Sequence, residues 1–220
     1  MCIPVKKMAI RLASVGRWTA TMDLYDFVPT SHRLILEPMR ILLLRHAKSS
    51  WDQPGLPDHD RPLAPRGERA APAMGAHLAE TDLRIDRIIS STAVRALSTA
   101  RLFREAFNQS IPLTTRRDLY HADPDSILAI ALEEAGGNPE ARILLVGHNP
   151  GMHELAVQLC SEGEPDQIDR LQAKFPTGAL AEFDLPDWGG ENELTAVPSA
   201  VRLVRYTRPK DLPGARSQGL

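Results

Sequence analysis

The chain has 220 residues, of which 43% are hydrophobic and 25% charged, so it is long enough to bury the core of one globular domain. Its 26 basic and 28 acidic residues give a net charge of −2, which excludes binding of nucleic acid or anionic lipid through bulk charge. Two cysteines and no apolar run near the roughly 18 residues of a membrane helix argue against a disulfide scaffold and a membrane protein. We therefore expect a cytoplasmic protein with no nucleic-acid and no membrane partner.

Three stretches of the chain differ in composition. Residues 1–38 begin weakly basic and lack a signal-peptide core of adequate length, so we expect a poorly ordered N-terminal extension with Met39 opening the domain. An organelle transit segment is the alternative for this stretch. Residues 39–208 form the predicted domain. Residues 209–220 contain Pro, Gly, Ser and charges without periodicity, which predicts a mobile C-terminal tail.

Strand and helix patterns alternate along the predicted domain. In chain order they predict strand 40–45, helix 66–80 with a kink or break near Pro72, strand 86–90, helix 92–107, strand 111–114, helix 124–135, strand 142–146, helix 150–160, and strands 179–185 and 200–206. Asp123 is the expected N-cap of helix 124–135, and Asn149 that of helix 150–160 with Pro150 at the first helical position. This alternation predicts an α/β fold, a three-layer sandwich with a mainly parallel central sheet flanked by helices.

Basic side chains follow three of these strands, at the point where each strand ends. Arg45 and His46 come at the end of the first strand, Arg95 lies in the first turn of the helix after the second, and His148 follows the strand at 142–146. Ligands of such sheets bind beyond the carboxyl ends of the strands. The sequence therefore predicts one site that contains two arginines and two histidines.

This set of residue types is suited to phosphoryl transfer. Guanidinium groups are permanently charged forks that match phosphate oxygens, and a neutral imidazole can attack phosphorus to form a phosphohistidine. Positioning and charge stabilisation supply most of the remaining catalysis. We expect Arg45 and Arg95 to lower the pKa of His46, which keeps the attacking ring neutral near pH 7.

A metal site is the main chemical alternative. His148 and His153 lie five residues apart, and three further histidines could approach them, namely His46, His59 and His121. The sequence lacks an HExxH motif, however, and two arginines in the same cluster would repel a divalent cation. No P-loop, GxGxxG or GxSxG motif is present, so we expect neither a metal nor a cofactor.

Four segments together resemble the histidine phosphatase superfamily, which has the phosphoglycerate-mutase-like fold. The first, LRHAKSSW at 44–51, is similar to the RHG motif of the family with Ala in place of Gly. The others are DRPL with RG at 60–67, SSTAVRALSTA at 90–100 and VGHNP at 146–150. They occur in family order over roughly residues 40–206, which makes the resemblance specific. The short chain and the residues of these motifs most resemble the SixA-like phosphohistidine phosphatase subgroup.

The resemblance implies specific roles for the predicted site residues. His46 would be the phosphorylated nucleophile, and three residues would form the phosphate pocket, namely Arg45, Arg95 and His148. Asp52 stands where many relatives have a phosphate-contacting Asn, which puts that contact in question.

The largest departure from the superfamily is the lack of an acidic Glu before the third helix. The corresponding stretch, 118–124, reads DLYHADP. His121 is a possible proton donor there, and it is preferred over Asp123, whose expected N-cap role already explains it. A weak or absent acid is tolerable for P–N cleavage, because the departing imidazole can already be protonated, but it is a handicap for alkyl phosphate esters.

These observations predict a metal-independent phosphatase that forms a covalent phosphohistidine at His46 and dephosphorylates protein phosphohistidine. One alternative is a hydrolase of small-molecule phosphate esters or pyrophosphates on the same pocket, in which case the partner is a small phosphorylated metabolite rather than a phosphorylated protein. Another is a non-catalytic phosphate-binding module. A phosphomutase is disfavoured by the missing Glu.

Overall fold

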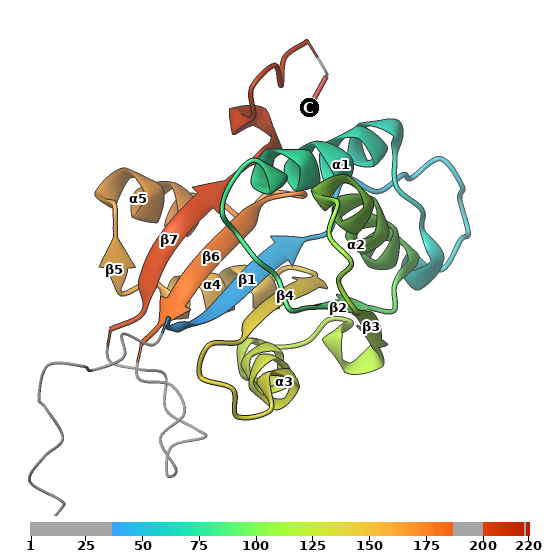
Figure 1. Cartoon of the computed structure of the whole chain (residues 1–220). Helices are drawn as coiled ribbons and strands as arrows, with labels where there is room; N and C mark the ends of the chain where they lie inside the picture. The colour runs from blue at the N-terminus through green and yellow to red at the C-terminus, as the bar shows by residue number, and fades with distance from the viewer. Residues whose placement is uncertain (1–36, 187–199, 218) are drawn as a thin grey trace, which may run out of the picture. The chain divides into compact units, whose positions relative to one another are not determined.

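A computed structural model describes residues 37–186, 200–217 and 219–220, which form a seven-stranded sheet with helices on both faces (Figure 1). The strands are β1 (Met39–Arg45), β2 (Arg87–Ser91), β3 (Leu113–Arg116), β4 (Arg142–Gly147), β5 (Glu162–Gly163), β6 (Leu180–Leu185) and β7 (Arg202–Thr207). Their order across the sheet is β3-β2-β4-β1-β6-β7-β5. Only β6 runs antiparallel to its neighbours, β1 and β7, so the predicted α/β class with a mainly parallel sheet is confirmed.

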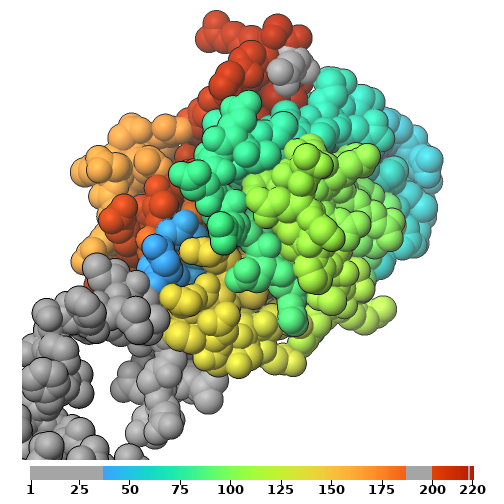
Figure 2. Space-filling view, in the orientation of Figure 1, coloured from blue at the N-terminus to red at the C-terminus, as the bar shows by residue number. Residues whose placement is uncertain are grey.

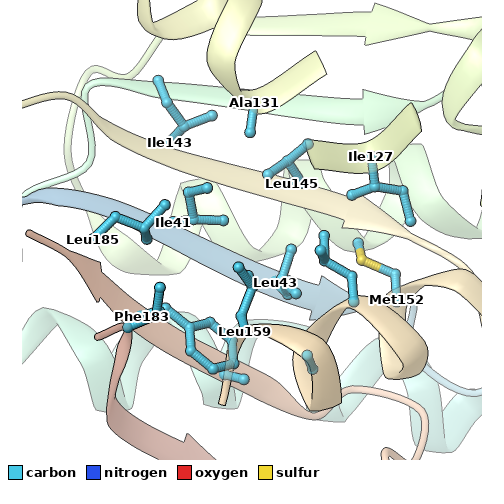
Figure 3. Close-up of a cluster of buried hydrophobic side chains, with 14 of the residues drawn as sticks. Ile41, Leu43, Ile127, Ala131, Ile143, Leu145, Met152, Leu159, Phe183 and Leu185 are labelled. Atoms are coloured by element: carbon cyan, nitrogen blue, oxygen red, sulfur yellow. The ribbon is translucent and has the colours of Figure 1, made fainter. Parts of the chain in front are cut away.

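The helices form the two outer layers of the sandwich. They are α1 (Pro65–Ala79), α2 (Val94–Phe107), α3 (Pro124–Ala135), α4 (Gly151–Leu159) and α5 (Pro165–Ala173). Side chains alternate across a strand, so Leu42 and Leu44 of β1 pack in one buried cluster with α1 and α2. Ile41 and Leu43 pack on the opposite face in a second cluster with α3 and α4 (Figure 3). None of the described helices is long and apolar enough to cross a membrane.

Three local features differ from the sequence predictions. Helix α4 begins at Gly151 with Pro150 as its N-cap residue, one position later than expected, and Asn149 is not the cap. Helix α1 continues through Pro72 without a break. Helix α5 and the two-residue strand β5 were not predicted, because α5 is short and mostly polar and buries only Leu171 fully.

The C-terminal segment also differs from its prediction. Residues 209–217 were expected to belong to a mobile tail, whereas Pro209–Asp211 form a 3₁₀ turn and Leu212 and Ala215 are 6% and 5% exposed. Both side chains join the buried cluster under α1, and Figures 1 and 2 show this segment lying against α1. Two isolated apolar residues were too few to reveal this packing in the sequence. The predicted N-terminal extension, apart from residues 37–38, lies outside the described residues.

Candidate active site

The register of the central strands brings the two predicted histidines together. Arg45 of β1 lies beside Gly147 of β4 in parallel register, so the residues that follow them, His46 and His148, leave the sheet at the same level. The backbone N–H of His46 donates to the Gly147 carbonyl at 3.0 Å, and the two imidazole ring centroids are 5.0 Å apart. Both side chains are almost fully buried. The structure therefore places the predicted pair at the carboxyl edge of the sheet.

One nitrogen of His46 is left free for attack. Its Nδ1 lies 2.7 Å from the Ala47 carbonyl, which can only accept, so Nδ1 carries the proton and the lone pair is on Nε2. Burial lowers the pKa of His46 to about 4, and the charges of Arg95 and Arg45 act in the same direction. The sequence predicted the contribution of the arginines, although burial is the larger cause. The ring is therefore neutral at neutral pH and has the free lone pair that a nucleophile requires.

The second histidine, His148, is oriented by a serine that sequence reasoning missed. The Nε2 of His148 lies 2.9 Å from the Ser91 hydroxyl, which already accepts from the Ala93 backbone N–H at 3.3 Å. That hydroxyl can therefore donate its own hydrogen to Nε2, which leaves the proton of His148 on Nδ1. Nδ1 is buried and has no partner among the described residues, so it is free to donate to a bound oxyanion. Burial, with the charge of His46, lowers the pKa of His148 to about 2.

The two arginines are held by different parts of the chain. The Nη1 of Arg45 donates to the Phe175 carbonyl at 2.8 Å, while its Nε is buried without a partner among the described residues. Arg95 is 4% exposed, and its carbonyl accepts from the Thr99 hydroxyl at 2.6 Å. The same hydroxyl accepts from the Ala47 backbone N–H at 3.0 Å, which ties the loop after β1 to α2.

The carboxylate of Asp58 forms a salt bridge with the guanidinium of Arg95. Asp58 lies in a 3₁₀ turn, Asp58–Asp60, and its Oδ2 accepts from Arg95 Nη2 at 2.8 Å and from the Tyr120 hydroxyl at 2.9 Å. Its Oδ1 accepts from Arg61 at 2.9 Å, and its backbone carbonyl also accepts from Arg95. Partial desolvation opposes ionisation, but hydrogen bonds from Tyr120 and Arg61 and the charge of Arg95 hold the pKa of Asp58 well below its usual range. Asp58 is therefore an acceptor in this site and not a proton donor.

The predicted proton donor, His121, lies beside His148 and is partly exposed to solvent. Its ring stacks on that of His148 with centroids 5.6 Å apart, and Tyr120 meets the same ring edge-on at 5.3 Å. The Nε2 of His121 lies 3.6 Å from Asp58 Oδ2, and its side chain is 53% exposed. Its backbone is left-handed, with φ at +57°, which is uncommon for a residue other than glycine.

The loop that carries His121 is held by a close approach of two backbones. A Cβ built on Gly151, the first residue of α4, would lie 2.0 Å from the Ala122 carbonyl oxygen. Only glycine allows α4 to begin this close to the loop. The position of His121 therefore depends on the same turn that carries His148.

Several other residues that the sequence singled out have structural roles. Asp123 caps α3 by accepting from the Ser126 N–H at 2.8 Å, as predicted. Asp52 is exposed and accepts from Ser50, with no contact to the arginines of the site. Trp51 is 72% exposed, and the guanidinium carbon of Arg61 lies 3.2 Å from its ring centroid.

Of the histidines considered for a metal, His46, His121 and His148 are neighbours, but the other two are held elsewhere. His153 faces the Leu171 carbonyl at 2.8 Å, and His59 lies between Asp60 and the Thr92 hydroxyl. No group of three or more His, Cys, Asp or Glu side chains among the described residues has a geometry that could hold a metal ion.

Comparison with known proteins agrees with this geometry. Residues 41–126 match the family model of the histidine phosphatase superfamily, branch 1. An uncharacterized protein of Mycobacterium leprae is 36% identical over 172 residues, which cover 76% of this chain and 100% of that protein. The SixA protein of Agrobacterium tumefaciens, assigned as a phosphohistidine phosphatase, is 31% identical with a TM-score of 0.63, over 78% of this chain and 99% of that one.

A further SixA structure, that of the protein histidine phosphatase complexed with tungstate, has a TM-score of 0.61 at 20% identity over 78% of this chain and 97% of that one, and so shows the fold. The chain belongs to the histidine phosphatase superfamily, as its motifs implied, and within it to the SixA-like proteins. It is a phosphatase with the phosphoglycerate-mutase-like fold.

Proposed function

We propose that this phosphatase removes the phosphoryl group from protein phosphohistidine through a covalent intermediate on His46, without a metal ion. The observation that carries the proposal is the buried, neutral His46 whose Nε2 lone pair has no competing hydrogen bond among the described residues. The SixA protein of Agrobacterium that is 31% identical bears the name of a phosphohistidine phosphatase, which supports the same substrate.

In the first step, His46 Nε2 attacks phosphorus, and the bond from phosphorus to the imidazole nitrogen of the substrate breaks. Arg45 and Arg95 neutralise the transferred group, and His148 Nδ1 donates to one of its oxygens. Arg95 reaches the phosphoryl group as that group displaces the carboxylate of Asp58. In the second step, water attacks the phosphorus on His46, inorganic phosphate leaves, and the free imidazole is restored.

The protonation states of the site favour this substrate over alkyl esters. The pKa values of His46 and His148 lie at about 4 and about 2, and that of Asp58 is also lowered, so none of the three holds an acidic proton at neutral pH. An alkoxide leaving group needs a strong donor, whereas a phosphohistidine imidazole leaves as a neutral ring once its second nitrogen is protonated. His121, 3.6 Å from Asp58, is the proposed donor where one is used.

The test compares phosphate release from a phosphohistidine peptide and from a phosphoserine peptide of the same sequence, with EDTA throughout. We expect release from phosphohistidine alone, and His46→Ala reduces it by at least about a thousandfold. His77→Ala, on the outer end of α1, is the matched control and keeps wild-type activity. Equal turnover of phosphoserine would refute the substrate assignment, and loss of activity with EDTA would refute metal independence.

A second measurement distinguishes an enzyme from a phosphate-binding module. Acid-sensitive, base-stable phosphate on the protein after rapid mixing with substrate, absent in His46→Ala, is expected for the covalent intermediate. Retained affinity for phosphate in a wild-type chain that releases none would instead support binding without catalysis.

A further inference from the structure

A strongly basic cavity of about 390 Å³ shares Arg45 with the candidate active site. Its walls come from the loop after β1, the first turns of α1, the loop before β6 and the segment after β7. Of the ten described residues that line it, six are cationic, namely Arg45, Lys48, Arg66, Lys174, Arg208 and Lys210. No acidic residue lines it in the part of the chain that the structure describes. In a chain of net charge −2, this concentration of positive charge is local.

Five of these six cations have no carboxylate partner among the described residues. Among the described residues, Arg208 alone has a carboxylate partner, Asp211, at 2.7 Å. The guanidinium of Arg45 is half-buried, and its Nε has no hydrogen-bond partner in the described part of the chain. Every lysine of the chain after Lys7 lines this one cavity. A concave surface lined by positive charges concentrates anions, and the mutual repulsion of the cations is relieved when an anion binds.

The cavity is built on the same backbone as the nucleophile. The Gly178 N–H donates to the carbonyls of both Arg45 and His46 at 3.1 Å. Gly178 has φ at +76°, and a Cβ there would lie 2.8 Å from Pro209 Cγ, so glycine lets the loop before β6 fit between β1 and the C-terminal segment. The charge of Arg45 is also close enough to His46 to contribute to its lowered pKa. An anion in the cavity and a phosphoryl group at His46 are therefore neighbours.

We propose that this cavity binds the chain of a linear phosphoanhydride, such as tripolyphosphate or the tail of a nucleoside triphosphate, while its terminal phosphoryl group lies at His46. This inference rests on the proposed nucleophile and adds a second substrate class to it. A cavity of this size holds a compact ligand, and several closely spaced cations match a chain that carries a negative charge on each phosphate.

The reaction uses the steps already described. His46 Nε2 attacks the terminal phosphorus, the bond to the bridging oxygen breaks, and the shortened chain leaves with that electron pair on its new terminal oxygen. Arg45, which lines both the phosphate site and the cavity, stabilises this charge. Water then attacks phosphorus on His46, the P–N bond breaks, and inorganic phosphate and one proton are released. A phosphate leaving group needs no strong acid, so the deprotonated site suits an anhydride as it suits a phosphoramidate.

The test measures kcat/KM of the full chain for inorganic tripolyphosphate, for a nucleoside triphosphate and for the phosphohistidine peptide. The pocket variant is Lys174→Gln with Lys210→Gln. The matched control is Arg84→Gln with Arg101→Gln, which removes the same charge from exposed positions outside the cavity. We expect the pocket variant to lower the ratio of kcat/KM for tripolyphosphate over the peptide at least tenfold, mainly through KM, and the control to leave both values unchanged.

The outcomes separate this inference from the proposed function. Peptide turnover without turnover of either anhydride refutes the inference alone. Turnover of both classes with an unchanged ratio in the pocket variant refutes the role of the cavity, and an equal loss for both assigns it to the protein substrate instead. If the pocket variant lowers kcat/KM only for the nucleoside triphosphate and not for tripolyphosphate, the cavity does not recognise the phosphate chain, and the inference is also refuted.

Binding is measured separately, in case no substrate is hydrolysed. Calorimetry of His46→Ala with tripolyphosphate is expected to show one site, weakened at least tenfold when Lys174→Gln and Lys210→Gln are added. An unchanged affinity refutes the cavity as the binding site even where the proposed chemistry has failed.

Discussion

The stability of the protein between pH 7 and pH 5 is expected to depend on His46. Its pKa is about 4 in the folded chain and 6.5 in the unfolded chain, so protons bind the unfolded state more strongly. The free energy of unfolding is therefore highest above about pH 6.5, where His46 is neutral in both states, and it decreases as the pH falls toward 4. From these two pKa values, His46 alone lowers the free energy of unfolding by about 2 kcal/mol between pH 7 and pH 5.

The measurement is urea denaturation of wild type and His46→Gln at several pH values in this range. We expect the difference in free energy of unfolding between the two proteins to change by about 2 kcal/mol in favour of the variant as the pH is lowered to 5. His77→Gln, which removes an imidazole at a less buried position, is measured alongside as the control variant. Parallel pH curves for wild type and His46→Gln would refute the claim that burial keeps this imidazole neutral.

Three further substitutions test the contacts around the site and the C-terminal segment. Ser91→Ala removes the hydroxyl that orients His148, so we expect kcat for the phosphohistidine peptide to fall roughly tenfold, the equivalent of one hydrogen bond; wild-type kcat would refute the assigned orientation. Asp58→Asn removes the carboxylate that competes with phosphate for Arg95, so inhibition by orthovanadate should tighten at least about threefold, and weaker inhibition would show that Asp58 instead holds Arg95 in place. Leu212→Ala should cost about 2 kcal/mol in urea denaturation, since the side chain is buried, and a cost below about 0.5 kcal/mol would show that the segment is not docked.

The histidines and arginines of the site could be predicted because they follow strands that are clear in the sequence. The short apolar runs that end at Arg45 and Val146 are strong strand signals, and parallel strands bring their carboxyl ends to one edge. The equal register of Arg45 and Gly147 then makes His46 and His148 neighbours without any detail of side-chain packing.

Residues that act through contacts between distant segments could not be predicted in the same way. Asp58 lies in a three-residue 3₁₀ turn, 37 residues before Arg95, and no periodicity indicates that its carboxylate meets that guanidinium. The sequence drew attention instead to Asp52, which the structure leaves exposed. The basic cavity is similar, because Lys48, Lys174 and Lys210 are scattered along the chain and only the packing of the C-terminal segment brings them together.

The kind of leaving group that suits this site follows from the lowered pKa values of His46, His148 and Asp58. Burial keeps His46 neutral and also lowers the pKa of its neighbour His148, so His148 holds no acidic proton at neutral pH. The hydrogen bonds that hold Asp58 beside Arg95 keep that carboxylate ionised. The same environment therefore favours attack on phosphorus and disfavours departure of a strongly basic oxygen. Substrates that bring their own stable leaving group, a protonated imidazole or a phosphate chain, escape this penalty. On our two proposals, the relative rates for these substrates depend on groups outside the immediate surroundings of His46, and the cations beside Arg45 are the described groups placed to affect that ratio.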